Sequence, residues 1–169
     1  IGTNAAECLD VKTDCGARGD GKGDDTAAFQ HCVATAHCCG GCIRVAVGTY
    51  PLTSVAINVS DLHVFVDAGT VLSTPVGYES GPAGGGILVI GGTDATAAHN
   101  ISIIGMGGQF VVDCTRQADI GSNRVAALRL HGNVRDFVLG NIRTEMKYGP
   151  QTGAHSQDLN TNAIAMGNV

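Results

Sequence analysis

Four carboxylates in the second half of the chain could exchange protons with a bound substrate: Asp113, Asp119, Glu145 and Asp158. General acid–base catalysis needs such a group within hydrogen-bond reach of the reacting atom. No paired spacing along the chain singles out two of them, and solvated loop or turn positions are the simpler interpretation. Asp158 is carried forward as the catalytic candidate among these carboxylates.

Three basic residues form a second group whose chemistry could serve a site: Arg143, Lys147 and His155. Arg143 and Lys147 are spaced i, i+4, and together with His155 they could hold the carboxylate of an acidic sugar. An exposed basic pair contributes little by itself and more often marks a solvated edge. The three residues are therefore candidate substrate-binding residues, which the fold would have to bring together.

Seven cysteines, six of them within the first 42 residues, are too many for a typical reduced cytosolic domain. They predict an oxidising compartment and disulfides, with these candidates: Cys8, Cys15, Cys32, Cys38, Cys39 and Cys42. A zinc site at Cys38-Cys39-Gly40-Gly41-Cys42 is the alternative, but its second ligand pair would have to come from Cys8, Cys15 or a histidine. The odd count leaves one thiol over, either Cys114 or one of the crowded cysteines. We expect no metal and no cofactor.

The composition excludes two classes of partner. The net charge is −5 without runs of Lys or Arg, which argues against nucleic acid because phosphates demand a basic face. No apolar run approaches the roughly 20 residues of a membrane span. The chain starts at Ile1 without a basic and apolar leader, so we expect a removed signal peptide and a secreted protein, extracellular or in a cell wall. Sequons at Asn58 and Asn100 fit a secreted glycoprotein, although ordinary turn asparagines explain them equally well.

The N-terminal residues predict a loop, a short helix and a strand. Residues 1–23 are rich in Gly and Asp and cannot hold a regular element. Residues 24–26 supply N-caps for a helix over 27–36, in which four apolar residues share one face. The Cys-Cys-Gly-Gly stretch at 38–41 ends this helix, and residues 42–47 alternate as a strand.

From residue 55 onward the sequence consists of short β-prone runs separated by turns, with no helical segment after residue 37. Such runs indicate a β-sandwich or a β-solenoid, and a helix before the strands favours the solenoid. The 25 glycines and only 4% aromatic residues favour small side chains stacked in coils. Asparagine tolerates left-handed backbone at repeated corners, and five asparagines precede β-branched residues: Asn58, Asn100, Asn133, Asn141 and Asn168.

The segment from Val11 to Gln30 resembles the entry motif of the pectin-lyase-like superfamily, in which a Gly-Ala-x-Gly-Asp-Gly turn leads into an Asp-Thr-x-Ala helix. The likeness continues through Gly40-Gly41, a strand and Gly48-Thr49-Tyr50, with Ala46 where the family usually has Pro. This resemblance implies a right-handed parallel β-helix with a short N-terminal capping helix.

Residues 61–72 and 103–113 are similar to strand and turn passages of polygalacturonases, glycoside hydrolase family 28. That family hydrolyses α-1,4-galacturonan with inversion, which needs an acid and a base about 6.5–9.5 Å apart. The resemblance places Asn160-Thr161-Asn162 where the family has Asn-Thr-Asp. Asn160 would then contact substrate, and Asn162 would stand at a catalytic position. An amide has no titratable proton, so Asn162 cannot act as the general base.

The family's later motifs, an Asp-Asp pair followed by Gly-His-Gly and Arg-Ile-Lys, have no counterpart before Val169. A calcium-assisted lyase remains an option within the superfamily, although no aspartate cluster suggests its metal site. The resemblance therefore supports ancestry among enzymes more firmly than activity.

The sequence thus predicts an all-β, right-handed parallel β-helix in one domain, 1–169. Residues 1–42 form the loop, capping helix and Cys-rich segment, and residues 43–169 form coils without a C-terminal cap. The expected function is a secreted, polygalacturonase-like glycoside hydrolase scaffold acting on pectin-type polysaccharide. The alternative is a non-catalytic structural, filament-forming or carbohydrate-binding protein. An uncapped last coil predicts end-to-end self-association when nothing else covers it.

Overall fold

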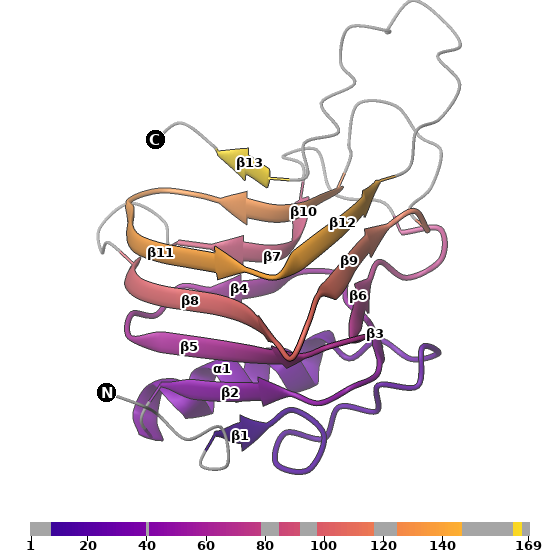
Figure 1. The fold of residues 1–169 in the computed structure, drawn as a ribbon, viewed down its shortest axis with the longest axis horizontal. Helices are drawn as coiled ribbons and strands as arrows, with labels where there is room; N and C mark the ends of the chain where they lie inside the picture. The colour runs from indigo at the N-terminus through magenta and orange to yellow at the C-terminus, as the bar shows by residue number, and fades with distance from the viewer. Residues whose placement is uncertain are drawn as a thin grey trace, which may run out of the picture.

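The computed structural model describes residues 8–39, 41–78, 85–91, 98–116, 125–146 and 164–166. The chain winds as a right-handed parallel β-helix with one helix at its N-terminal end, so the predicted fold class is confirmed (Figure 1). Right-handed winding is also the hand that nearly all parallel crossover connections adopt. In the view of Figure 1 the coils stack upward from the N-terminal end. We call that end lower and the opposite end upper.

The strands form three parallel sheets that run along the helix axis. Sheet A holds β1 (Leu9–Asp10), β2 (Cys42–Val45), β5 (Leu62–Asp67), β8 (Ala98–Met106) and β11 (Val134–Gly140). Sheet B holds β3 (Thr49–Pro51), β6 (Val71–Ser73), β9 (Phe110–Cys114) and β12 (Ile142–Met146). Sheet C holds β4 (Val55–Ile57), β7 (Gly85–Ile90), β10 (Val125–Leu130) and β13 (Ile164–Met166). Each coil passes through the sheets in the order A, B, C, and the described strands stack four coils.

Apolar side chains stack in line inside the coils. Ile43, Val64 and Ile103 occupy aligned positions in successive strands of sheet A, and all three are buried. In β5 the alternation of buried and half-buried residues is complete, as expected for a strand with one face in the core and one in solvent. At this stacked position each coil contributes one β-branched or leucine side chain, which is why the interior needs few aromatic residues.

Left-handed corners recur in the stack, but aspartate shares them with asparagine. Asn100 and Asn141 have φ of 53° and 56°, as predicted, whereas Asp61 and Asp136 take the same conformation at φ of 57° and 52°. Residues Asp61, Asn100 and Asp136 each precede a stacked core residue, and the Asn100 amide donates to the Asp61 carboxylate at 2.8 Å. Neither Asn58 nor Asn133 is a positive-φ corner, because the turn's left-handed residue lies elsewhere. Asn168 lies outside the described residues.

The helix α1 (Thr26–Cys39) covers the lower end of the coils. It ends at Cys39, within the Cys-Cys-Gly-Gly stretch at 38–41, as predicted. The stop comes at Gly41, whose φ is 71° and whose N–H donates to the Ala36 carbonyl at 2.8 Å. This is the glycine-terminated C-cap, which a residue with a Cβ adopts only under strain.

Residues 8–39, which we call the cap, provide hydrogen-bond partners for the lower edge of each sheet. The kind of partner differs from sheet to sheet. Strand β1 pairs with β2 and so extends sheet A. In sheet B, the Thr49 N–H donates to the Gly19 carbonyl at 3.1 Å. In sheet C, the side-chain amide of Gln30 both donates to and accepts from the backbone of Ala56, each at 3.0 Å. The cap therefore supplies hydrogen-bond partners to the lower edges of β2, β3 and β4.

Replacing Gln30 with Ala is expected to lower the free energy of unfolding by about 1–2 kcal/mol, because both backbone groups of Ala56 lose a partner in a partly buried edge. Gln30→Glu keeps an acceptor and should lose roughly half as much. Urea unfolding of the two variants measures the difference. Two equal, near-zero changes would contradict the edge-capping role.

A buried carboxylate fixes the turn that precedes the helix. Asp25 is 3% exposed, and its two oxygens accept from the N–H groups of Arg18 and Gly19 at 2.9 and 3.0 Å. The Asp24 side chain accepts from the Thr26 N–H at 2.9 Å as the predicted N-cap. The paired aspartates of the entry motif thus shape the cap, and neither faces a cleft.

Two disulfides staple the cap: Cys8–Cys42 and Cys15–Cys32. Four of the six candidate cysteines are therefore paired as predicted, and none of these four is a zinc ligand. The side chains of Cys38 and Cys39 lie outside the described residues. Among the described cysteines, Cys114 is free and buried, which is one of the two outcomes expected from the odd count.

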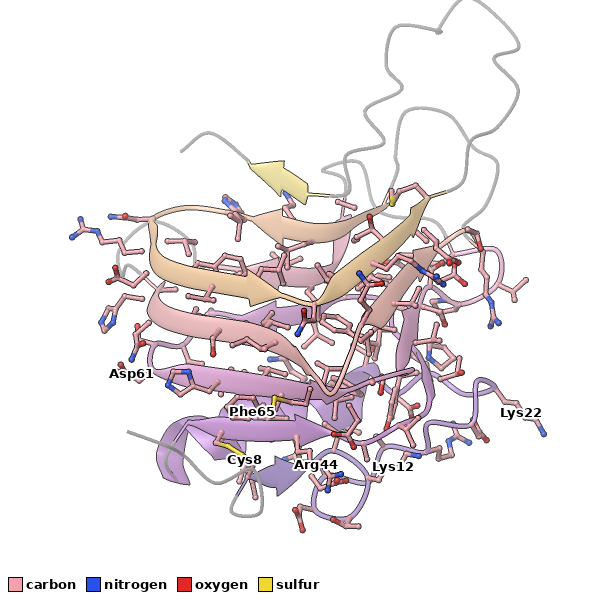
Figure 2. The ribbon with its side chains drawn as sticks, in the orientation of Figure 1. Cys8, Lys12, Lys22, Arg44, Asp61 and Phe65 are labelled. Atoms are coloured by element: carbon pink, nitrogen blue, oxygen red, sulfur yellow. A yellow bond between two sulfur atoms is a disulfide. The ribbon has the colours of Figure 1, made fainter. Side chains whose placement is uncertain are left out.

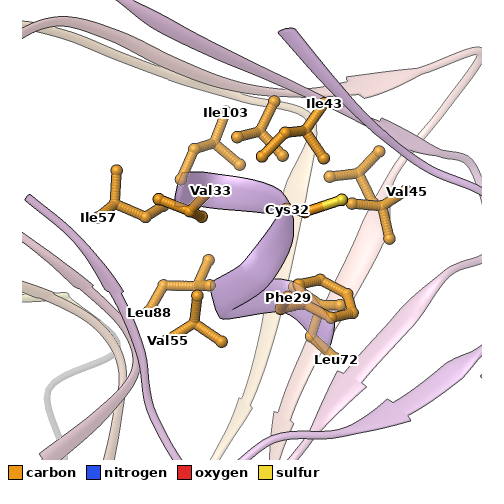
Figure 3. Close-up of a pocket in the computed structure, with 12 residues that line it drawn as sticks. Phe29, Cys32, Val33, Ile43, Val45, Val55, Ile57, Leu72, Leu88 and Ile103 are labelled. Atoms are coloured by element: carbon orange, nitrogen blue, oxygen red, sulfur yellow. The ribbon is translucent and has the colours of Figure 1, made fainter. Parts of the chain in front are cut away.

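A small apolar cavity lies between α1 and the first coils (Figure 3). Val33 and Cys32 of the helix face Ile43, Val45 and core residues of sheet C across it. Its lining carries almost no polar surface, so nothing there would orient a polar ligand. We assign this cavity to imperfect packing between the helix and the coils.

Candidate functional site

The corner where sheet B passes into sheet C is the place at which this β-helix departs most from regularity. The connection is short in the first coil, at residues 52–54, and longer in the next three, at 74–84, 115–124 and 147–163. We call this region the long-loop corner. Loops of variable length on a rigid scaffold are where binding and catalytic residues concentrate.

Two carboxylates lie side by side where sheet B enters the long-loop corner. Asp113 of β9 is in register with Glu145 of β12 above it and with Ser73 of β6 below it. Their neighbours Leu72 and Val112 point into the core, so this row belongs to the outer face of the sheet. Backbones of adjacent strands are about 4.8 Å apart, which brings the two carboxylates within reach of one bound group.

Hydrogen bonds and cations hold both carboxylates. One oxygen of Asp113 accepts from the N–H and the hydroxyl of Thr115 at 2.8 and 2.6 Å, and the other lies 3.9 Å from the Arg116 Nε. Glu145 accepts from the Arg143 guanidinium at 2.7 Å. The side chain of Asp113 is 14% exposed and that of Glu145 is 41% exposed, so one is fixed and the other is accessible. The two arginines offset the two negative charges.

The outer face of sheet C forms the other side of the corner. There Ala56, Val89 and Arg129 are in register in successive strands, and position 165 of β13 follows them. Arg129 is the charged residue of this row. Together the two faces offer carboxylates on one side of the corner and a cation on the other.

Only some of the candidate residues chosen from sequence lie among the residues that the structure describes. Arg143 lies in β12, where residues i and i+2 share a face, and its partner there is Glu145. Five candidates fall in the connection outside the described residues: Lys147, His155, Asp158, Asn160 and Asn162. Asp119 also lies outside the described residues, in the connection at 115–124. Their roles remain predictions.

Sequence reasoning named Asp113 and Glu145 but did not pair them. Their alignment follows from the register of β9 with β12, which places Val112 opposite Thr144 and Cys114 opposite Met146. A search for carboxylates one residue before the end of successive β-prone runs would have found both. Such a search requires the positions of the strand ends, which the sequence predicted only approximately.

The outer face of sheet A also carries paired side chains, but they serve cross-strand pairing. Figure 2 shows Arg44 and Phe65 on neighbouring strands of this face. The Arg44 guanidinium contacts Asp67 at 2.7 Å, and the His63 Nδ1 lies 2.9 Å from the Ser102 hydroxyl. Each of these two polar pairs joins neighbouring strands, which stabilises the sheet.

Cys114 lies directly after Asp113 with its thiol in the core. Burial, and secondarily the Asp113 charge, raise the pKa of this thiol to about 12. The thiol therefore stays protonated at neutral pH, and a protonated thiol is a poor nucleophile. It contributes packing beneath the carboxylate pair.

No protein-family model matches the chain. An iota-carrageenase of Zobellia galactanivorans (strain DSM 12802 / CCUG 47099 / CIP 106680 / NCIMB 13871 / Dsij) is 28% identical over 131 residues, which are 77% of this chain and 25% of the relative. The chain thus spans about a quarter of that protein.

Several solved structures share the fold. An iota-carrageenase complexed to iota-carrageenan fragments has a TM-score of 0.66 at 19% identity, over 85% of this chain and 32% of that one. The family GH82 iota-carrageenase from A. fortis has a TM-score of 0.65 at 20% identity, over 85% and 31%. PfbA, a surface adhesin of Streptococcus pneumoniae, has a TM-score of 0.69 at 19% identity, over 93% and 42%.

These comparisons define the class of the chain as a parallel β-helix of glycoside hydrolase-like fold. They do not single out family 28, so the polygalacturonase assignment stays a prediction. In the described part of the chain no helix is long and apolar enough to cross a membrane.

Proposed function

We propose that the protein is an extracellular β-helix that binds an anionic polysaccharide at the long-loop corner and hydrolyses it. Asp113 and Glu145 act as the pair of carboxylates, and Arg116, Arg143 and Arg129 hold the anionic groups of the sugar chain. The in-register pair of carboxylates, each beside its own arginine, is the observation that carries the proposal.

The chemistry of the pair suits glycoside hydrolysis, which uses two carboxylic groups flanking one glycosidic bond. The accessible Glu145 is placed to donate a proton to the leaving oxygen. Asp113, held by Thr115, is placed to attack or to activate water. Retaining enzymes hold their two carboxyl groups roughly 5–5.5 Å apart and inverting enzymes about 6.5–9.5 Å apart, so the anomer of the product reports which of the two mechanisms this pair uses.

The arginines explain how an acidic protein would hold an acidic polymer. The net charge of −5 opposes capture of a polyanion at long range, so local cations must supply the attraction. Arginine suits both sulfate and carboxylate groups because its planar fork presents parallel donors. The iota-carrageenase relative favours a sulfated galactan, and the sequence motifs favour a pectin-type galacturonan.

Reducing-end release tests the proposal, with iota-carrageenan, polygalacturonate and neutral agarose as three parallel substrates. We expect release from one of the two anionic polymers and none from agarose. Affinity electrophoresis in gels containing each polymer measures binding separately, with Arg116→Ala expected to weaken it and Arg135→Ala, on the opposite corner, as the matched control. Release from agarose alone, or from no polymer, would contradict the proposal.

A second candidate function is assembly without catalysis. In β11 and β12 the inward-facing Phe137, Leu139 and Ile142 are only partly buried, unlike their counterparts in lower coils. Covering these side chains by a second copy would lead to end-to-end assembly. Sedimentation velocity over a hundredfold range of concentration decides: growth of larger species supports assembly, and a constant monomer contradicts it.

The proposed extracellular location gives a prediction for the two sequons. Asn58 is exposed between β4 and β5, whereas Asn100 sits at a left-handed corner with its amide bonded to Asp61 and its sequon serine, Ser102, bonded to His63. After expression through a eukaryotic secretory pathway, Asn58→Gln is expected to remove an N-glycan, as measured by intact mass. Asn100→Gln is the matched control and should leave the glycan in place. Loss of the glycan only in that control would contradict this assignment.

A further inference from the structure

The cap holds its place on the coils through hydrogen bonds to strand edges. The N–H groups of Thr49, Thr53 and Ala56 donate downward, to the Gly19 carbonyl, the Thr26 hydroxyl and the Gln30 side chain. Edge groups of this kind pair readily with another strand when they are uncovered. The lower end of the β-helix is therefore a pairing surface that the chain itself covers.

Both described disulfides fasten this cover. Cys8–Cys42 ties β1 to β2 (Figure 2), and Cys15–Cys32 ties the turn after β1 to the middle of α1. Cys8, Cys15 and Cys42 are half-buried, while Cys32 is buried. Cys8–Cys42 is therefore the more accessible bridge, and access governs which disulfide a thiol attacks first.

We propose that the cap is a redox-gated cover: reduction of its two disulfides releases it from β3 and β4, and the exposed strand edges then pair with a second copy of this chain. Solenoids open from their ends because a terminal unit has neighbours on one side only. The coils above keep their own hydrogen bonds, such as that from the Leu52 N–H to the Ser73 carbonyl at 2.7 Å.

Reduction of the two disulfides requires a dithiol reductant, which supplies the electrons and protons. Each cysteine bridge accepts two electrons and two protons, which gives two thiols, and the reductant becomes its own disulfide. A second copy is the fitting partner because it presents the lower edges of β3 and β4, in sheets B and C, in the same arrangement. Two lower ends related by a twofold axis would pair like with like and close as a dimer.

Hydrogen exchange on the intact protein tests the proposal, with samples oxidised or reduced by dithiothreitol and blocked with iodoacetamide. We expect the amides of Thr49, Thr53 and Ala56 to exchange about 30-fold faster or more after reduction. Two amides away from the cap are the internal controls: that of Leu52, which donates to Ser73 in the coil above, and that of Val111 in the third coil, which donates to Thr70 in the second. Both should change by less than about threefold. Sedimentation should show a dimer only in the reduced sample.

Two double variants each remove one bridge without a reductant: Cys8→Ser with Cys42→Ser, and Cys15→Ser with Cys32→Ser. Cys114→Ser is the matched control, since that thiol forms no bridge. Faster edge exchange with dimer formation in either pair supports the proposal. Unchanged edge exchange, uniform acceleration at all amides, or a reduced protein that stays monomeric would each overturn it.

Discussion

Replacing Glu145 with Gln is expected to slow glycosidic cleavage by about 10³-fold, because an amide can neither give nor take the proton of the leaving oxygen. The substitution keeps the side-chain size and a hydrogen-bond acceptor for Arg143, so polysaccharide binding should change less than threefold or so. Asp113→Asn should cause a loss of similar size. Initial rates of reducing-end release measure both variants, and affinity electrophoresis measures binding.

The matched control is Asp136→Asn. Asp136 is an exposed carboxylate at a left-handed corner away from the long-loop corner, and asparagine tolerates that conformation. Its rate should equal that of the wild type. Full activity in Glu145→Gln, or an equal loss in Asp136→Asn, would remove the carboxylate pair from the mechanism. Product anomer analysis by NMR then separates retention from inversion, which is the outcome that the polygalacturonase resemblance implies.

The second large effect is expected at Gly19, where alanine should lower the free energy of unfolding by about 3 kcal/mol. Gly19 has φ of 62°, and an added Cβ would lie 2.6 Å from the Lys12 Cε and 2.8 Å from the Tyr50 ring. The lysine can move, but the ring cannot, because Tyr50 is 0% exposed and packs edge-on against Phe29 with centroids 5.2 Å apart. Guanidinium unfolding gives the value.

Gly16→Ala isolates the backbone part of that cost. Gly16 has φ of 83°, yet nothing lies within 4 Å of its added Cβ, so only about 1 kcal/mol should be lost. A difference of about 2 kcal/mol between the two variants is expected. Equal losses would mean that the contact with Tyr50 does not set the position of the turn.

The lower end of the fold could be predicted from sequence because local chemistry determines it. The turn needs glycine at Gly19, where a side chain would strike the Tyr50 ring, and it needs Asp25 to accept two backbone N–H groups. Both requirements are local, so the residues that meet them stand at a fixed spacing in the motif. The resemblance of that motif to the pectin-lyase-like superfamily implied a capping helix on a β-helix, which was confirmed.

The candidate site was less predictable because it depends on register between distant coils. Asp113 and Glu145 meet only when the connections between β9 and β12 have the lengths that align them. Loop lengths vary at the long-loop corner, and no local sequence pattern indicates which residues of successive coils become aligned. The corners show a milder version of this problem: Asp61 and Asp136 occupy left-handed positions that were sought among asparagines, because both residue types tolerate that conformation.

The most direct test of the central claim is a titration of the ¹⁵N-labelled protein with short oligosaccharides of the anionic polymer that it binds. The account predicts chemical-shift changes at Asp113, Arg116, Arg143 and Glu145, with none at Phe65 on the outer face of sheet A. Shift changes centred on Phe65, or no changes at saturating oligosaccharide, would contradict a polysaccharide site at the long-loop corner.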